Sequence, residues 1–216
     1  MKISKIATVT VVSLALAIFA IFSYKVNSLP PADNLSNVLE NLYAQDQAIR
    51  QAGLNNPIDI AKMMLTDWYR IKKVRRIVDA DILLAAQDYA NAAKILQHGS
   101  KSSDFLKAKE LSIKAFELGE SAMLKHSALA EDRYLKSIGK AQKYGSQIVC
   151  DASGWHLYKL DPQITDRDRA EKNIEPIDQM IKKVAMIQTE IGNNCMMSKE
   201  QINIFEKIMS GQSNEN

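Results

Sequence analysis

The chain has few of the residues that break regular structure, with 8 Gly and 5 Pro among 216 residues, and no low-complexity tract. This scarcity excludes collagen-like and broadly disordered proteins. The sequence also lacks phosphate-loop, zinc-protease and serine-hydrolase motifs, and its three His are not clustered with carboxylates at ligand spacing. We therefore predict no metal and no cofactor. The absence of these motifs argues against an enzyme but does not exclude one.

A surplus of charge of one sign is also missing from most of the chain. The formal net charge is +3, but Lys2, Lys5 and Lys25 account for it, because removing them leaves 25 Lys and Arg against 25 Asp and Glu. Nucleic-acid binding needs a basic surplus facing the phosphates. We therefore expect no nucleic-acid partner.

One long apolar run occurs, at residues 6–22, and it carries no charge. As a helix it is about 25 Å long, close to the thickness of a bilayer's hydrocarbon core. Residues 1–25 are thus a signal anchor or a signal peptide, and the large side chains near the exit favour an uncleaved anchor. Lys2 and Lys5 favour the cytoplasmic side, which predicts a single pass in a bacterial inner membrane with the domain in the periplasm. If the segment is cleaved, the chain is secreted to the periplasm.

Cysteine is scarce, and both residues, Cys150 and Cys195, lie in the part predicted to be exported. In an oxidising compartment two Cys of one small domain are most simply a disulfide. The alternative is two separate buried thiols that pack as small apolar groups. A redox or metal role is disfavoured because there is no CxxC motif.

Apolar residues at helical spacing dominate the rest of the chain. The predicted helices cover residues 35–49, 57–78, 82–97, 105–118, 122–140, 175–191 and 199–209. Residues 145–160 differ, since two short β-prone arms flank the turn at Asp151–Gly154 and predict a small hairpin. The expected fold is therefore mainly α, with one domain of about six to seven helices and a β-hairpin-like insert. Its predicted parts are a Pro-containing spacer at 26–34, the domain at 35–210 and a disordered tail at 211–216.

Residues 88–135 hold three successive Ala-rich helices with Gly at the breaks, which resembles tetratricopeptide or Sel1-like helical hairpins locally. Longer stretches, KILQHG, AEDRYLKSIGKAQKYGSQ and DPQITDRDRAEKNIEPIDQM, resemble a bacterial family known as domain of unknown function 6624. The family has no established activity, so the resemblance, over roughly residues 43–180, implies a fold and shared positions only. Those positions are Asp46, Gln47, Arg50, Gln97, His98, Gly99, Asp132, Arg133, Gln142, Tyr144, Gly145, Ser146, Gln147, Pro162, Asp166, Arg169 and Pro176.

Several polar residues stand where an apolar helix stripe is expected. Asp46 lies on such a stripe, and a buried carboxylate needs a partner, for which Arg50 is one helical turn away. This pair is either an ordinary helix-edge ion pair or part of a cleft. Asp132 either anchors the loop at residues 142–147 through its amides, Ser146 or Gln147, or acts as an acid or base. His98 either interacts as a cation with a helix end or serves as a catalytic base.

Two functions fit this sequence. The first is an exported, membrane-tethered helical domain that binds an unidentified protein or envelope component, or has a structural role there, with Trp155 and Tyr158 rimming its surface. The alternative is an envelope hydrolase with His98 and Asp132 as catalytic candidates in a polar cleft. The remaining candidates for a ligand site or polar network are Asp46, Arg50, Arg133, Gln142, Tyr144, Ser146, Gln147 and Arg169.

Overall fold

A computed structural model describes Ala17, Ser23, Tyr24, residues 26–52, residues 56–193, Cys195, Met197 and residues 199–211. The predicted anchor at residues 6–22 lies outside these residues apart from Ala17, and the predicted tail lies outside them apart from Gly211. Within the described ranges, no helix combines the length and the apolar character needed to cross a membrane.

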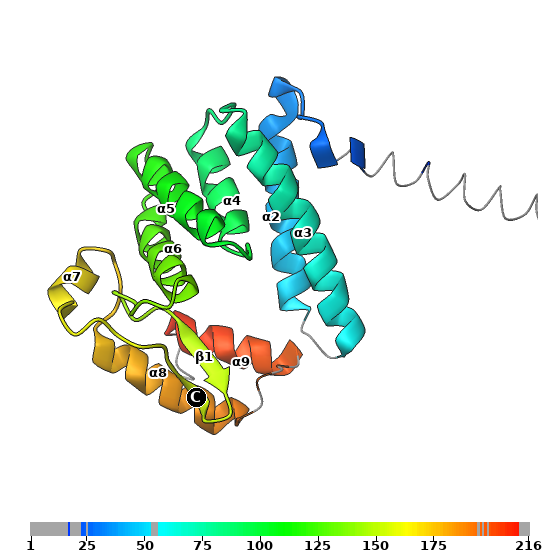
Figure 1. The fold of residues 1–216 in the computed structure, drawn as a ribbon. Coiled ribbons are helices and arrows are strands. Elements are labelled where there is room, and N and C mark those ends of the chain that lie inside the picture. Colours follow the sequence, from blue (N-terminus) through cyan, green and yellow to red (C-terminus); the bar gives the residue numbers. More distant parts are fainter. Residues whose placement is uncertain are drawn as a thin grey trace, which may run out of the picture.

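The described chain is mainly helical, as predicted, with one two-stranded antiparallel sheet (Figure 1). In the sheet Cys150 pairs with Trp155, and Asp151 with Gly154. The elements are η1 (Ala32–Asn34), α2 (Leu35–Gln51), α3 (Pro57–Asp79), α4 (Ala86–Leu96), α5 (Ser102–Glu117), α6 (Met123–Ser137), β1 (Ile148–Asp151), β2 (Gly154–Leu157), α7 (Asp166–Ala170), α8 (Ile177–Ile191) and α9 (Lys199–Ser210).

The main apolar core lies between α2, α3, α4 and α5, with one edge of α6. Leu39, Val74, Ile77 and Ile95 are fully buried there because each falls on the apolar stripe of its helix. Buried alanines on α4 and α5 allow these helices to approach closely. This packing places the C-terminal end of α4 beside the middle of α2 and α3, where the polar residues discussed below converge.

A second apolar core joins the hairpin to α8 and α9, which lie together at one end of the molecule in Figure 1. The expected disulfide between Cys150 and Cys195 is present, with an S–S distance of 2.02 Å, and ties β1 to the connection between α8 and α9. A cross-link over 45 residues stabilises a fold by about 4 kcal/mol on the chain-entropy model. The disulfide and this core together hold α9 near the end of α2.

Three local features differ from the sequence prediction. The helix expected from residue 82 begins at Ala86, because the Asp88 carboxylate accepts a hydrogen bond from the Ala85 amide and starts the helix there. The five-residue helix α7 was not predicted. In the predicted spacer Val26 is 1% exposed, and Lys73 of α3 donates to Ser28, so this part of the spacer packs against the folded domain.

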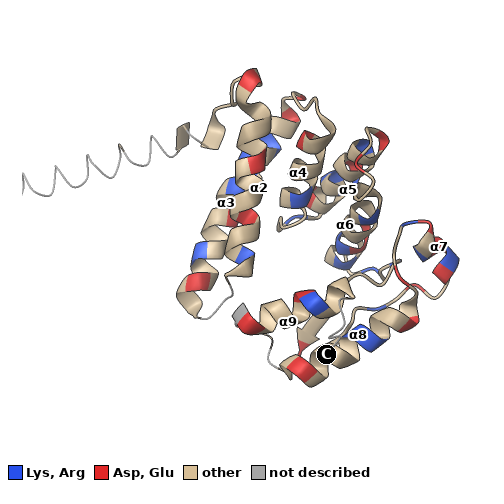
Figure 2. Ribbon diagram, turned by 180° about the vertical axis from the view of Figure 1, so that it is seen from behind, with Lys and Arg blue, Asp and Glu red and all other residues tan. Residues whose placement is uncertain are grey.

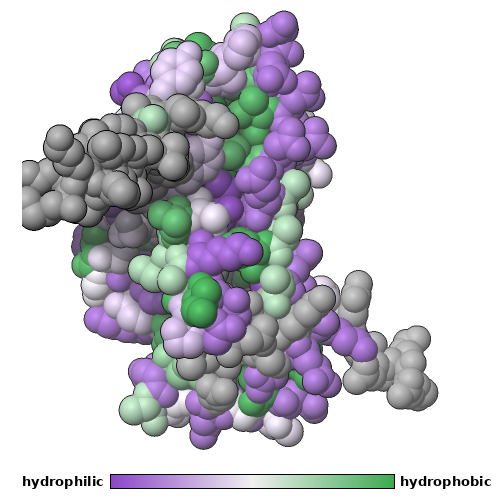
Figure 3. All heavy atoms as spheres, turned by 90° about the vertical axis from the view of Figure 1, so that its right-hand side faces the viewer, coloured by the Kyte–Doolittle hydropathy of each residue, from purple (hydrophilic) through white to green (hydrophobic). Residues whose placement is uncertain are grey.

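Charged residues are spread along the helices, with basic and acidic residues interspersed (Figure 2). Exposed apolar side chains are concentrated in the first half of α3, at Ile58, Met64, Leu65 and Trp68. Figure 3 looks onto the side of the molecule where α3 lies in Figure 1, and apolar patches interrupt the hydrophilic surface there. This helix therefore offers the surface of the described chain that is richest in solvent-exposed apolar groups.

Candidate functional site: an arginine, aspartate and histidine cluster beside a cavity

Four side chains from α2 and α3 form a compact ionic network. Asp46 is 1% exposed and accepts from Arg50, with its Oδ1 2.8 Å from Arg50 Nη2. The same Nη2 atom lies 2.9 Å from Asp67 Oδ2, and Arg70 binds Asp67 and lies 3.6 Å from Asp46 Oδ1. Two guanidinium groups therefore neutralise two carboxylates, which allows all four groups to be largely withdrawn from water.

His98 follows α4 and reaches this network from the other side. Its Nε2 atom lies 3.5 Å from Asp46 Oδ2. Burial holds the pKa of His98 well below its ordinary value, and the positive charges of Arg50, Arg133 and Arg70 lower it further, against the opposing effect of Asp67. This shift favours the neutral imidazole over the cationic helix-end interpretation of the sequence.

Gly99 explains how the chain turns immediately after His98. A Cβ atom at this position would overlap the side chain of Asp104. Asp104 in turn accepts a hydrogen bond from the amide of Lys101, 3.1 Å away, at the start of α5. The Gln-His-Gly step thus has a local steric reason that does not depend on any activity.

Arg133 extends the cluster from α6. Its Nη1 donates to the Gln97 carbonyl oxygen at 2.5 Å, and its Nε lies 3.4 Å from Gln147 Oε1. Burial lowers the pKa of Arg133 to about 10, with a further contribution from Arg50. Among the described residues no carboxylate lies within ion-pair distance of this guanidinium, so its direct partners are neutral oxygen atoms.

Asp132 points elsewhere and holds a loop. It is fully buried, and it accepts hydrogen bonds from the amides of Lys143 (2.7 Å), Tyr144 (3.0 Å) and Ser146 (3.0 Å) and from the Ser146 hydroxyl (2.9 Å). Burial raises the pKa of Asp132, and these hydrogen bonds act in the opposite direction. A carboxylate with four donors has little capacity left for a substrate, so the geometry fits the loop-anchoring interpretation.

Gln142 closes the other side of the same loop. It is fully buried, donates to the carbonyl oxygens of Gln147 (3.1 Å) and Tyr158 (2.9 Å), and accepts from the Gln147 amide (2.7 Å). These bonds fix the backbone of Gln147, and its side chain donates to the Ser146 hydroxyl at 3.1 Å and meets Arg133. Asp132, Gln142 and Gln147 thus connect the loop to the cluster through Arg133 without themselves touching Asp46 or His98.

Two sequence-predicted residues lie apart from this arrangement. Arg169 is 3% exposed and binds Asp166 (3.1 Å) and the Ile164 carbonyl oxygen (3.3 Å), so its contacts are local to α7. Trp155 is 7% exposed and packs against Phe205 with ring centroids 5.9 Å apart. The prediction that Trp155 rims a surface is wrong, because its face of β2 lies against α8 and α9.

A cavity of about 530 Å³ lies beside the cluster, between α3 and the turn that precedes α5. Asp67 and His98 line both the cavity and the cluster. Its other walls include apolar side chains of α3 and basic side chains of α3 and of the turn. This volume is within the range of small-molecule sites, so the cluster has an open space next to it in which a ligand fits.

Sequence reasoning missed Asp67 and Arg70 as members of the cluster. The sequence signal that could have found them was their spacing, since residues three apart on a helix can pair, and Arg70 interrupts the apolar stripe of α3.

Among the described residues, no group of three or more His, Cys, Asp and Glu is arranged to hold a metal ion. No protein-family model, curated protein or solved structure matches this chain.

Proposed function

We propose that this chain is an exported binding domain of the bacterial cell envelope, tethered to the inner membrane through residues 6–22, and that it performs no chemistry of its own. Its binding site is the cavity beside the cluster of Asp46, Arg50, Asp67, Arg70 and His98. The observation that carries the proposal is that this preformed ionic network, which pairs its charges internally, reaches the wall of an open cavity of about 530 Å³ through Asp67 and the neighbouring His98. Because its charges pair with one another, the network holds its groups in place for recognition and does not activate a nucleophile.

Ligand-observed NMR with a library of small molecules tests this function on the full chain in detergent. We expect several molecules to bind, and binding to weaken at least about tenfold in Ser100→Trp, because the indole fills the cavity that Ser100 lines. The matched control is Ser137→Trp, which adds the same group at an exposed position at the end of α6. No binding, or binding that Ser100→Trp leaves unchanged, contradicts the proposal.

One observation favours the alternative of an envelope hydrolase. A neutral His98 lies beside the cavity with a carboxylate 3.5 Å from its Nε2, as an oriented general base requires. In this alternative the partner of His98 is Asp46 rather than Asp132, whose oxygens are occupied by the loop. Chemical conversion of a bound molecule, lost in His98→Gln, would replace the binding proposal by the hydrolase.

A further inference from the structure

The basic groups around the cavity are not balanced by acidic ones. Asp67 is already shared by Arg50 and Arg70. Lys72 and Lys101 line the cavity, and neither has a carboxylate within ion-pair distance among the described residues. A small concave space next to two uncompensated ammonium groups has a positive potential, which favours negatively charged ligands.

The remaining basic residue of the wall, Arg75, forms an ion pair with Asp104. Its Nε and Nη2 atoms lie 2.6 and 2.5 Å from the two Oδ atoms of Asp104. This two-pronged pair fixes Arg75 between α3 and the start of α5. Arg75 therefore shapes the cavity, and the uncompensated charge belongs to the two lysines.

In addition to these basic groups, the cavity has an apolar wall on α3. Met64 and Trp68 are 64% and 48% exposed although they line a concave space, and the buried Ile71 lies one turn further along the helix. The Lys72 ammonium lies 5.0 Å from the centre of the Trp68 ring, a cation–π arrangement that holds the indole and the charge side by side. Ligand sites commonly combine an apolar aromatic wall with a few charged groups in this way.

We propose that the cavity binds a small organic acid with a flat apolar body, whose carboxylate lies between Lys72 and Lys101 and whose body lies against Trp68 and Met64. This inference rests on the proposed function, since it assumes that the cavity is the binding site. His98, at the edge of the cavity, can donate its ring N–H to this carboxylate. Asp67 does not repel the acid strongly, because Arg50 and Arg70 neutralise it.

Isothermal titration calorimetry of the full chain with three probes tests this ligand class. The probes are naphthoate, its uncharged amide naphthamide, and inorganic phosphate. We expect naphthoate to bind at least about tenfold more tightly than either of the others, since only naphthoate supplies both the charge and the apolar body. If naphthamide binds as tightly as naphthoate, the ligand does not need a negative charge. If phosphate binds as tightly as naphthoate, the ligand does not need an apolar body. Failure of naphthoate to bind overturns the whole inference.

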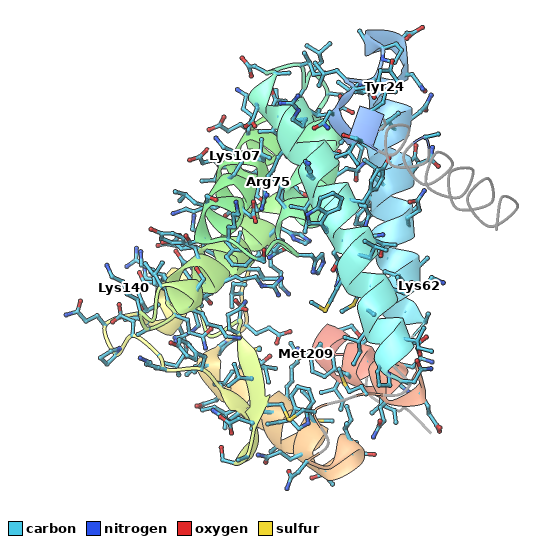
Figure 4. The ribbon with its side chains drawn as sticks, turned by 45° about the vertical axis from the view of Figure 1, so that its right-hand side comes forward. Tyr24, Lys62, Arg75, Lys107, Lys140 and Met209 are labelled. Atoms are coloured by element: carbon cyan, nitrogen blue, oxygen red, sulfur yellow. A yellow bond between two sulfur atoms is a disulfide. The ribbon has the colours of Figure 1, made fainter. Side chains whose placement is uncertain are left out.

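A matched pair of double variants locates the charge effect. Lys72→Glu with Lys101→Glu reverses the two cavity lysines, and we expect naphthoate affinity to fall at least about tenfold. Lys62→Glu with Lys140→Glu changes the net charge equally at exposed positions outside the cavity, and we expect little effect. Figure 4 labels Lys62 and Lys140 on different sides of the molecule and Arg75 near its middle. Equal losses in both double variants would show a net-charge effect and overturn the cavity assignment.

These outcomes distinguish the inference from the proposed function. If neutral molecules from the library bind and Ser100→Trp abolishes their binding, the cavity remains the site even when naphthoate fails. If naphthoate binds but Ser100→Trp and the cavity-lysine variant leave it unaffected, the site lies elsewhere and both proposals fail.

Discussion

Replacing Asp132 by Ala should lower the free energy of unfolding by about 4 kcal/mol, since it leaves three buried or partly buried amides and a hydroxyl without their acceptor. The loop that Asp132 holds also carries Gln147, which contacts Arg133. We therefore expect the second apolar core, which follows this loop in the chain, to lose cooperativity with the first. Urea denaturation followed by far-ultraviolet circular dichroism measures the change.

Ser146→Ala is the matched control for Asp132→Ala. It removes the hydroxyl, which donates to Asp132 at 2.9 Å and accepts from Gln147 Nε2 at 3.1 Å, and it keeps the three amide contacts of Asp132, so its expected cost is about 1 kcal/mol. If Asp132→Ala costs no more than Ser146→Ala, Asp132 does not anchor the loop. In that case an acid or base role for Asp132 becomes the better interpretation.

Replacing Asp46 by Ala should cost about 3 to 5 kcal/mol, because it leaves Arg50 and the buried Arg70 sharing the single carboxylate of Asp67. The unfavourable term is a buried positive charge with too few partners, not the loss of one hydrogen bond. The double variant Asp46→Ala with Arg50→Ala should therefore cost less than the sum of the two single variants. The same denaturation measurement gives all three values.

Glu40→Ala provides the comparison on the same helix. Glu40 is exposed, and we expect its replacement to change stability by less than about 0.5 kcal/mol. Strict additivity of Asp46→Ala and Arg50→Ala in the double variant would contradict the network, because uncoupled residues add.

The long helices were predictable because each has an apolar stripe of its own, as α2 shows with Leu35, Leu39 and Leu42. The pairing of Asp46 with Arg50 followed from their spacing within one helix, and the cysteine pair followed from the presence of two cysteines in one domain that was predicted to be exported. These predictions needed only local geometry or counting. They gave the polar residues of α2 and α6 but not the site that α2 forms with α3.

The cluster itself needed the packing of α3 against α2, which no periodicity within either helix specifies. Asp67 and Arg70 are partners of Arg50 and Asp46 only because the two helices lie side by side. The cavity could not be predicted from the sequence either, since its walls come from α3 and from the turn before α5. Helix α7 was missed because five residues are too few for a periodic pattern, although its cap, Thr165 with Asp168, was present in the sequence.

Whether the cavity beside His98 binds anions is tested by measuring the pKa of His98 by imidazole NMR without and with naphthoate. His98→Gln identifies the signal among the three His. The charged groups that face His98 are Asp46, Arg50, Asp67, Arg70 and Arg133.

In the free chain we expect a His98 pKa well below the ordinary value of about 6.5, because burial and the arginines disfavour the imidazolium. A bound carboxylate adds negative charge and should raise this pKa. Proton uptake is then linked to binding, so naphthoate should bind more tightly as the pH falls through the bound-state pKa. A His98 pKa at or above about 6.5 in the free chain, or one that saturating naphthoate leaves unchanged, would contradict anion binding in the cavity beside His98.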